Sequence, residues 1–209
     1  MFFLNQSPWL LAICSGILVG ISYLPIKLGF LSYFGFIPIF HSWISNDPNS
    51  NFKSGLVFGL SYNLISNYWI GTNSGAEFYV VLLSLLFAVF YLGLFWAIAG
   101  YVFGQIRTSD NVYFILPLLI VSLEWVRSFG PLGFSWGNLV LTQSEYLLNL
   151  QLIDLTGPYL ITFLIILLNV LGHFYITKKS QLNKNFYIII LSLLIVPLFG
   201  LYRINNIQT

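Results

Sequence analysis

Glu124 and Arg127 are the first residues in this sequence whose types and spacing could support chemistry. Because they are three positions apart, their side chains share one face of a helix. One interpretation is a structural ion pair, in which each charge neutralises the other at the end of an apolar segment. The other is that one of the two contacts a lipid headgroup or a neighbouring domain, since a guanidinium matches a phosphate bidentately.

Amides and imidazoles supply further candidates. Asn63 and Asn67 are four positions apart, shortly before Trp69, so the two amides also share a helix face. We expect them to form hydrogen bonds between helices, and a substrate contact is the alternative. For His41 and His173, both among apolar neighbours, neutral hydrogen-bonded imidazoles are the simpler interpretation, and a metal site or a proton relay is the alternative.

Cys14 is the single cysteine, which excludes a disulfide framework and a cysteine-rich metal site. Its apolar surroundings predict a small filler residue within a first membrane segment. The sequence contains no plausible Ser–His–Asp grouping and no glycine loop suited to phosphate. The residues by themselves therefore predict no catalytic residue, no metal and no cofactor.

The composition indicates the class of protein that must position these residues. Of 209 residues, 58% are hydrophobic and 7% are charged, and the mean hydropathy is +0.86. A soluble domain has about 25% charged residues, and 19% aromatic residues exclude a disordered chain. The net charge of +2, with lysines and arginines dispersed along the chain, argues against nucleic-acid binding. The sequence predicts an integral membrane protein.

Charged residues mark the ends of the expected membrane segments, because a charge at the bilayer centre is costly. The uncharged runs between them predict an all-α, polytopic membrane helical bundle with about seven transmembrane helices, forming a single domain over residues 1–209. The expected spans are residues 8–24, 28–45, 54–71, 78–105, 112–127, 158–177 and 185–203.

The distribution of lysine and arginine predicts the orientation. With a cytoplasmic N-terminus, five basic residues fall on the inner side and three on the outer side, and the C-terminus is periplasmic. The inner set is Lys53, Arg107, Lys178, Lys179 and Lys184, and the outer set is Lys27, Arg127 and Arg203.

An irregular outer loop is expected over residues 128–157. Its glycines and prolines break helices, while Phe129, Phe134 and Trp136 suit a membrane interface or a shallow re-entrant turn. We expect function to be concentrated in this loop.

Several short motifs, taken in chain order, resemble the membrane domain of bacterial apolipoprotein N-acyltransferase. They are Ser22-Tyr23-Leu24-Pro25, Gly55-Leu56-Val57-Phe58-Gly59, Asn67-Tyr68-Trp69, Glu124-Trp125-Val126-Arg127, Leu132-Gly133-Phe134-Ser135-Trp136, Gln143, Leu155-Thr156-Gly157-Pro158-Tyr159 and the run Thr162-Phe163-Leu164 through Asn169. The resemblance makes six residues candidates for outer-face contacts with substrate or lipid, or for a structural role there: Glu124, Arg127, Trp136, Gln143, Asn67 and Trp69.

The sequence also departs from the family pattern. Phe134-Ser135-Trp136 replaces the usual Phe-Pro-Trp, and Val140 and Leu141 stand where an aromatic residue commonly precedes the glutamine. In the family, the seventh span leads into a nitrilase-like domain with a Glu-Lys-Cys triad, whereas this sequence stops at Thr209. We therefore carry over no catalytic residue and expect no acyl transfer from this chain alone.

The resemblance implies a function in lipoprotein synthesis at the bacterial inner membrane. The family transfers an acyl chain from a phospholipid to the N-terminal amine of a diacylglyceryl-cysteine lipoprotein, through a thioester on the catalytic cysteine. This chain would be the membrane-embedded half, which anchors the catalytic domain and gives lipidic substrates access to it. Its partners would be the phospholipid bilayer, a separately encoded nitrilase-like domain and, once the enzyme is reconstituted, the diacylated lipoprotein.

The alternative is a stand-alone polytopic membrane protein, such as a small transporter or an assembly partner. A transporter is expected to carry a polar or charged site near the middle of the membrane. Here the charges lie at the ends of the expected spans instead. A fragment, one piece of a split enzyme and a stand-alone protein all fit the sequence.

Overall fold

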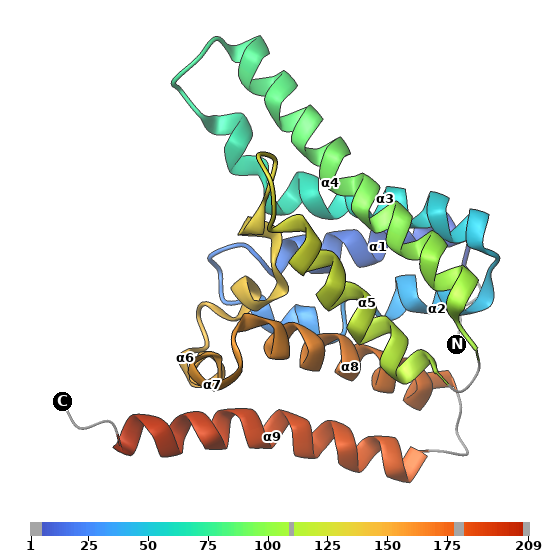
Figure 1. Ribbon diagram of the computed structural model, residues 1–209, viewed down its shortest axis with the longest axis vertical. Helices are drawn as coiled ribbons and strands as arrows, with labels where there is room; N and C mark the ends of the chain where they lie inside the picture. The colour runs from blue at the N-terminus through green and yellow to red at the C-terminus, as the bar shows by residue number, and fades with distance from the viewer. Residues whose placement is uncertain (1–5, 109–110, 178–181, 207–209) are drawn as a thin grey trace.

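The computed structural model describes residues 6–108, 111–177 and 182–206, and the regular structure in these ranges is helical throughout (Figure 1). The longer helices are α1 (Pro8–Ile21), α2 (Ile37–Ser45), α3 (Pro48–Ser66), α4 (Phe78–Ile106), α5 (Val112–Arg127), α8 (Pro158–Thr177) and α9 (Leu182–Asn206). Shorter elements join them: η2 (Gly29–Tyr33), η3 (Tyr68–Thr72), η4 (Ser135–Gly137), η5 (Leu139–Gln143), α6 (Leu147–Leu150) and α7 (Ile153–Thr156).

Glycine permits a very close approach between α3 and α4. A Cβ atom at Gly55 would lie 2.5 Å from the carbonyl oxygen of Trp96, and one at Gly59 would lie 2.7 Å from the Cα of Gly93. The Gly55-x3-Gly59 spacing thus brings the two backbones together, as small residues do in membrane helix pairs. On the other side of α3, Gly16 of α1 approaches Ser61 in the same way.

The core is built around α2, which lies in the middle of the bundle. Residues 28–45, expected as the second span, form η2, a turn and the nine-residue α2. Phe36, Phe40 and Trp43 have no exposed surface, and the Phe36 ring packs against those of Phe58 and Trp96. This aromatic core joins α2 to α3 and α4.

The other face of the core is covered by α5 and α8, which pack against each other. Helix α8 begins at Pro158, and proline is well tolerated in the first turn of a helix. Helix α9 lies along α8 and α6, at the lower edge of Figure 1.

The helix junctions gather at two opposite ends of the molecule. At the first, which we call the Arg107 end, the α2–α3 and α4–α5 junctions meet the last turn of α8. At the second, the Trp136 end, residues 128–157 meet the turn that follows α1, and Trp136 itself contacts Trp69 of η3. Figure 1 shows the longer helices running between these two ends.

In the part of the chain that the structure describes, two helices are long and apolar enough to cross a membrane, α4 and α8. Helix α1 has 14 residues and α5 has 16, fewer than the roughly 20 that a span requires. The helix lengths therefore leave the seven-span count unconfirmed. Of the residues used to predict orientation, Lys178 and Lys179 lie outside the described residues, as does the side chain of Lys184.

Candidate functional site

Glu124 lies in the last helical turns of α5, with only 1% of its surface exposed. Its Oε1 atom accepts a hydrogen bond from the backbone N–H of Leu139 at 2.6 Å. Its Oε2 atom accepts another from the hydroxyl of Thr162 at 2.7 Å. One carboxylate thus ties together α5, α8 and the irregular segment between them.

Arg127 is equally buried, one helical turn further on. Its Nη2 atom lies 3.2 Å from Asn138 Oδ1, to which it donates, while Nε and Nη1 have no hydrogen-bond partner among the described residues. Gly137 lies directly against the guanidinium, because a Cβ atom there would be 3.1 Å from Nη2. The arginine therefore supports the same irregular segment that Glu124 holds.

Glu124 and Arg127 do not form a direct ion pair, which was one of the two interpretations of their spacing. Within the described ranges, the side-chain salt bridge is the one between Arg203 and Asp154, at 2.9 Å. The two oxygens of Glu124 instead accept hydrogen bonds from the backbone N–H of Leu139 and the hydroxyl of Thr162. The two opposite charges on α5 still interact electrostatically across the site.

Two tyrosines complete this cluster, and the sequence did not single them out for this role. The hydroxyls of Tyr23 and Tyr62 lie 2.9 Å apart, and the carbonyl oxygen of Gly137 accepts from this pair, at 3.0 and 2.8 Å respectively. Because Tyr23 follows α1 and Tyr62 belongs to α3, the cluster anchors residue 137 to both helices. The signal that could have found them is a tyrosine within an otherwise apolar segment, whose hydroxyl needs a partner.

Gln143 has no exposed surface and forms a second buried polar cluster. Its Oε1 accepts from the hydroxyl of Tyr33 at 2.8 Å and from the amide of Asn149 at 3.0 Å. Its Nε2 donates to the hydroxyl of Ser32 at 3.1 Å. Gln143 therefore lies inside a buried set of hydrogen bonds and has no exposed surface.

Asn169 of α8 extends this second cluster to the centre of the bundle. Its Nδ2 donates to the carbonyl of Ser32, and its Oδ1 accepts from the backbone N–H of Phe36. Thr162 and Asn169 are seven positions apart on α8, so they share its inward face. Polar residues at this spacing in an apolar helix are a signal that predicts buried hydrogen-bond partners.

Trp69 and Trp136 are the two predicted site residues that reach the surface. They are 45% and 67% exposed, and their ring centroids lie 5.8 Å apart. Trp69 belongs to η3 and Trp136 to η4, so the pair joins the end of α3 to the segment that Glu124 and Arg127 hold. A paired, exposed indole surface is suited to a lipid or protein contact.

Asn67, two positions before Trp69, is buried. Its Nδ2 donates to Asn63 Oδ1 at 3.3 Å, and Asn63 in turn donates to the carbonyl of Gly59 at 2.7 Å. These bonds remain within one helical segment, so the expectation of hydrogen bonds between helices is wrong for these two amides. Their spacing of four residues lets them pair along α3 itself.

The fold and the site together define the class: over the described residues, this is a helical protein with two helices apolar enough to cross a membrane and with an irregular segment fixed by buried polar groups. The model of the apolipoprotein N-acyltransferase N-terminal domain matches residues 15–171 of this chain. The chain belongs to the apolipoprotein N-acyltransferase family, and the match covers that family's N-terminal domain.

Known proteins named apolipoprotein N-acyltransferase are similar over most of this chain. One from Geobacter metallireducens is 34% identical over 168 residues, covering 78% of this chain and 32% of that protein. One from Rickettsia bellii is 26% identical, covering 79% of this chain and 34% of that protein. The chain therefore spans about a third of the length of the curated relatives it matches.

Proposed function

We propose that this chain is the membrane-embedded part of an apolipoprotein N-acyltransferase-like protein, which anchors the catalytic domain and gives its lipidic substrates access. The observation that carries the proposal is the exposed Trp69–Trp136 pair, held in place by a buried set of charges and hydroxyls. Burying Glu124 and Arg127 is costly, and here both serve to fix the segment that presents Trp136. Such an exposed surface is suited to contact a lipid or a protein outside the helical bundle.

The proposed topology has seven membrane passes, with the N-terminus in the cytoplasm and the C-terminus in the periplasm. The arrangement of the helices supports it, because the described helices run alternately between the Arg107 end and the Trp136 end (Figure 1). Lys53 and Arg107 lie at the first end, as the excess of basic residues in cytoplasmic loops requires. The Trp136 end then faces the periplasm.

The chemistry itself is assigned to the part of the relatives that this chain does not match. Acyl transfer through a thioester needs a thiolate with a nearby base. Cys14 lies within α1, half-buried. Because Cys14 lies within an apolar helix, we infer that it is not the nucleophile of this reaction.

Reconstitution tests the proposal. The polypeptide of residues 1–209 is combined with phospholipid, a diacylated lipoprotein and the separately expressed C-terminal remainder of the Geobacter metallireducens relative. We expect triacylated lipoprotein when both polypeptides are present, and none from residues 1–209 alone. Turnover by residues 1–209 alone that Cys14→Ser abolishes would overturn the proposal, as would full turnover by the other polypeptide without this chain.

A further inference from the structure

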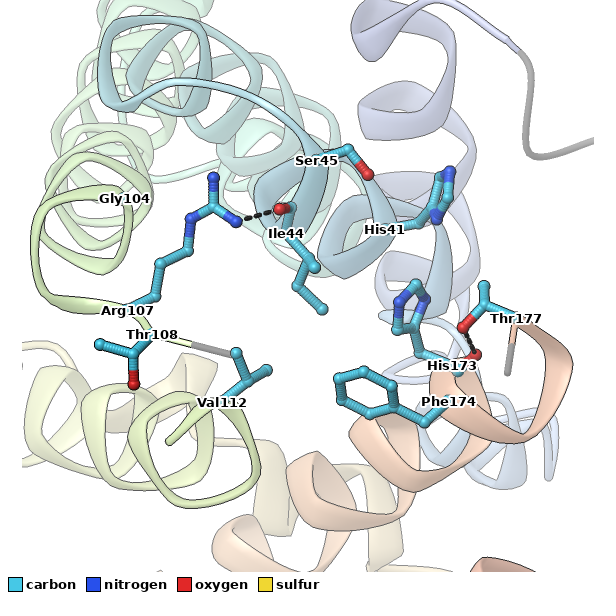
Figure 2. Close-up of a pocket in the computed structure, with 10 residues that line it drawn as sticks. All are labelled: His41, Ile44, Ser45, Gly104, Arg107, Thr108, Val112, His173, Phe174 and Thr177. Atoms are coloured by element: carbon cyan, nitrogen blue, oxygen red, sulfur yellow. Dashed lines mark hydrogen bonds between the residues drawn. The ribbon is translucent and has the colours of Figure 1, made fainter. Parts of the chain in front are cut away.

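A pocket of about 620 Å³ opens at the Arg107 end, far along the helices from the tryptophan pair. Figure 2 shows the side chains that surround it, contributed by α2, the end of α4, the start of α5 and the last turns of α8. His41 and His173, two candidates from the sequence, line it, and none of the six predicted outer-face residues does. The pocket is therefore separate from the polar clusters at the other end.

Arg107 provides a fixed positive charge at this pocket. Its guanidinium donates from Nη1 to the carbonyl of Ile44, and from Nη2 to the carbonyl of Asn46 at 2.7 Å. The guanidinium has five N–H donors, so these two bonds hold it in place and leave further donors for a ligand. A preformed cationic group of this kind is suited to an oxyanion.

His41 and His173 contribute polar ring atoms on the opposite side of the pocket. Their ring centroids lie 5.3 Å apart, and in Figure 2 the two imidazoles face each other across the gap between α2 and α8. The exposed hydroxyl of Ser45 lies beside His41 in the same view. Imidazole and hydroxyl groups both donate hydrogen bonds to an anion.

The remaining wall of the pocket is apolar and comes from Ile44, Val112 and Phe174. The pocket thus combines a cationic and hydrogen-bonding side with an apolar side. Among the described residues that line it there is one arginine and no carboxylate. In the sequence, Asp110 comes two positions after Thr108, and Lys178 and Lys179 come directly after Thr177.

We propose that this pocket binds a phosphate group, with Arg107, His41 and His173 as its ligands. The apolar wall favours a phosphate that carries an acyl-chain substituent, as in the headgroup of an anionic phospholipid. The inference does not depend on the proposed acyltransferase function, because the pocket lies at the opposite end from the tryptophan pair.

Two probes distinguish the possible sources of the phosphate. Phosphatidylglycerol and diacylglycerol with the same acyl chains are titrated against residues 1–209 in detergent, and bound lipid is counted by native mass spectrometry. Inorganic phosphate is titrated separately, and the ring resonances of His41 and His173 are followed by NMR. A lipid site retains phosphatidylglycerol in preference to diacylglycerol, whereas a site for free phosphate shifts the histidine resonances.

Three variants make the test specific. Arg107→Gln removes the charge, and His173→Phe keeps a ring but removes its nitrogen atoms. Lys53→Gln is the matched control, since it removes an exposed positive charge near the start of α3, at the same end of the molecule. We expect the dissociation constant of the bound probe to rise about tenfold in the first two variants and to stay unchanged in the control.

The outcomes are decisive in both directions. If Arg107→Gln and His173→Phe selectively lose the binding of either probe, the site is supported. The probe whose binding is lost then identifies whether the phosphate belongs to a lipid or is free. The proposal is overturned if neither probe binds, if diacylglycerol binds as well as phosphatidylglycerol while phosphate has no effect, or if Lys53→Gln weakens binding equally. Because Arg107 also caps α2, circular dichroism is measured for each variant, and His173→Phe decides the question where Arg107→Gln does not fold.

Discussion

The carboxylate of Glu124 accepts a hydrogen bond from the backbone N–H of Leu139 at 2.6 Å, and both residues are buried. A charged group on α5 therefore satisfies a backbone donor in the segment with the least regular structure. That donor would otherwise be buried without a partner, because Leu139 has no exposed surface. The relationship explains how residues 134–143 can lie against the bundle while Trp136 projects outward.

Replacing Glu124 by alanine is expected to destabilise the fold strongly. The change leaves the N–H of Leu139 and the hydroxyl of Thr162 without their acceptor, and it leaves the Arg127 charge uncompensated. Removing one member of a buried charge pair costs about 3–5 kcal/mol. Thermal unfolding in detergent measures the loss, and Glu77→Ala, at an exposed carboxylate before α4, should have little effect. Equal losses in the two variants would contradict the assigned role.

Replacing both charges should be milder than the single changes predict. Glu124 and Arg127 form no direct salt bridge, but their opposite charges share one buried site. A double-mutant cycle with Glu124→Gln and Arg127→Met should give a coupling free energy of about 1 kcal/mol or more. The free energies of unfolding of the four proteins in detergent provide the measurement. Strictly additive losses would show that the two residues act independently.

The close contact between α3 and α4 predicts a sharp response at Gly55. An added Cβ would meet the carbonyl oxygen of Trp96 at 2.5 Å, and backbone cannot move away as a side chain can. We expect Gly55→Ala to lower the free energy of unfolding by about 1–3 kcal/mol. Gly75→Ala is the control, because its nearest neighbour is the side chain of Asn73 at 3.2 Å in an exposed turn. A stable Gly55→Ala protein with unchanged unfolding would contradict this packing.

Charged residues interrupt the apolar runs of the sequence, and some helix ends follow them. Helix α4, for example, begins directly after Glu77 and ends directly before Arg107. Within residues 28–45, Gly29, Gly35 and Pro38 favour a short and irregular segment, and the structure divides these residues into η2 and α2. The sequence does not show that Phe36, Phe40 and Trp43 would be completely buried, because that depends on how α2 packs against α3 and α4.

The candidate site was predicted in part. Glu124 and Arg127 were identified from their types and spacing, and Trp136 from the resemblance, but the spacing did not predict that Leu139 and Thr162 would be the partners of the carboxylate. Those partners are distant from Glu124 along the chain or belong to an irregular segment. Periodicity within one helix carries no information about them. The same holds for His41 and His173, whose contact depends on how α2 and α8 pack.

Labelling of single cysteines tests the proposed topology. In a Cys14→Ser background, Ser74→Cys places a thiol in the exposed loop after η3, and Asn49→Cys places one in the exposed first turn of α3. A membrane-impermeant maleimide should label Ser74→Cys in intact spheroplasts and Asn49→Cys only after permeabilisation. Labelling of both, or the reverse pattern, would contradict a periplasmic Trp136 end.

The tryptophan pair gives the prediction closest to function. Because Trp136 is 67% exposed, Trp136→Ala should change the free energy of unfolding by no more than about 0.5 kcal/mol. Exposed tryptophans often contribute about 2 kcal/mol or more to a binding contact, so we expect triacylated product in the reconstituted reaction to fall by about tenfold or more. Trp9→Ala is the matched control, since Trp9 is 50% exposed but lies at the Arg107 end. A loss of turnover shared by both variants would show that general aromatic anchoring matters, whereas unchanged turnover in Trp136→Ala would remove the pair from the proposed function.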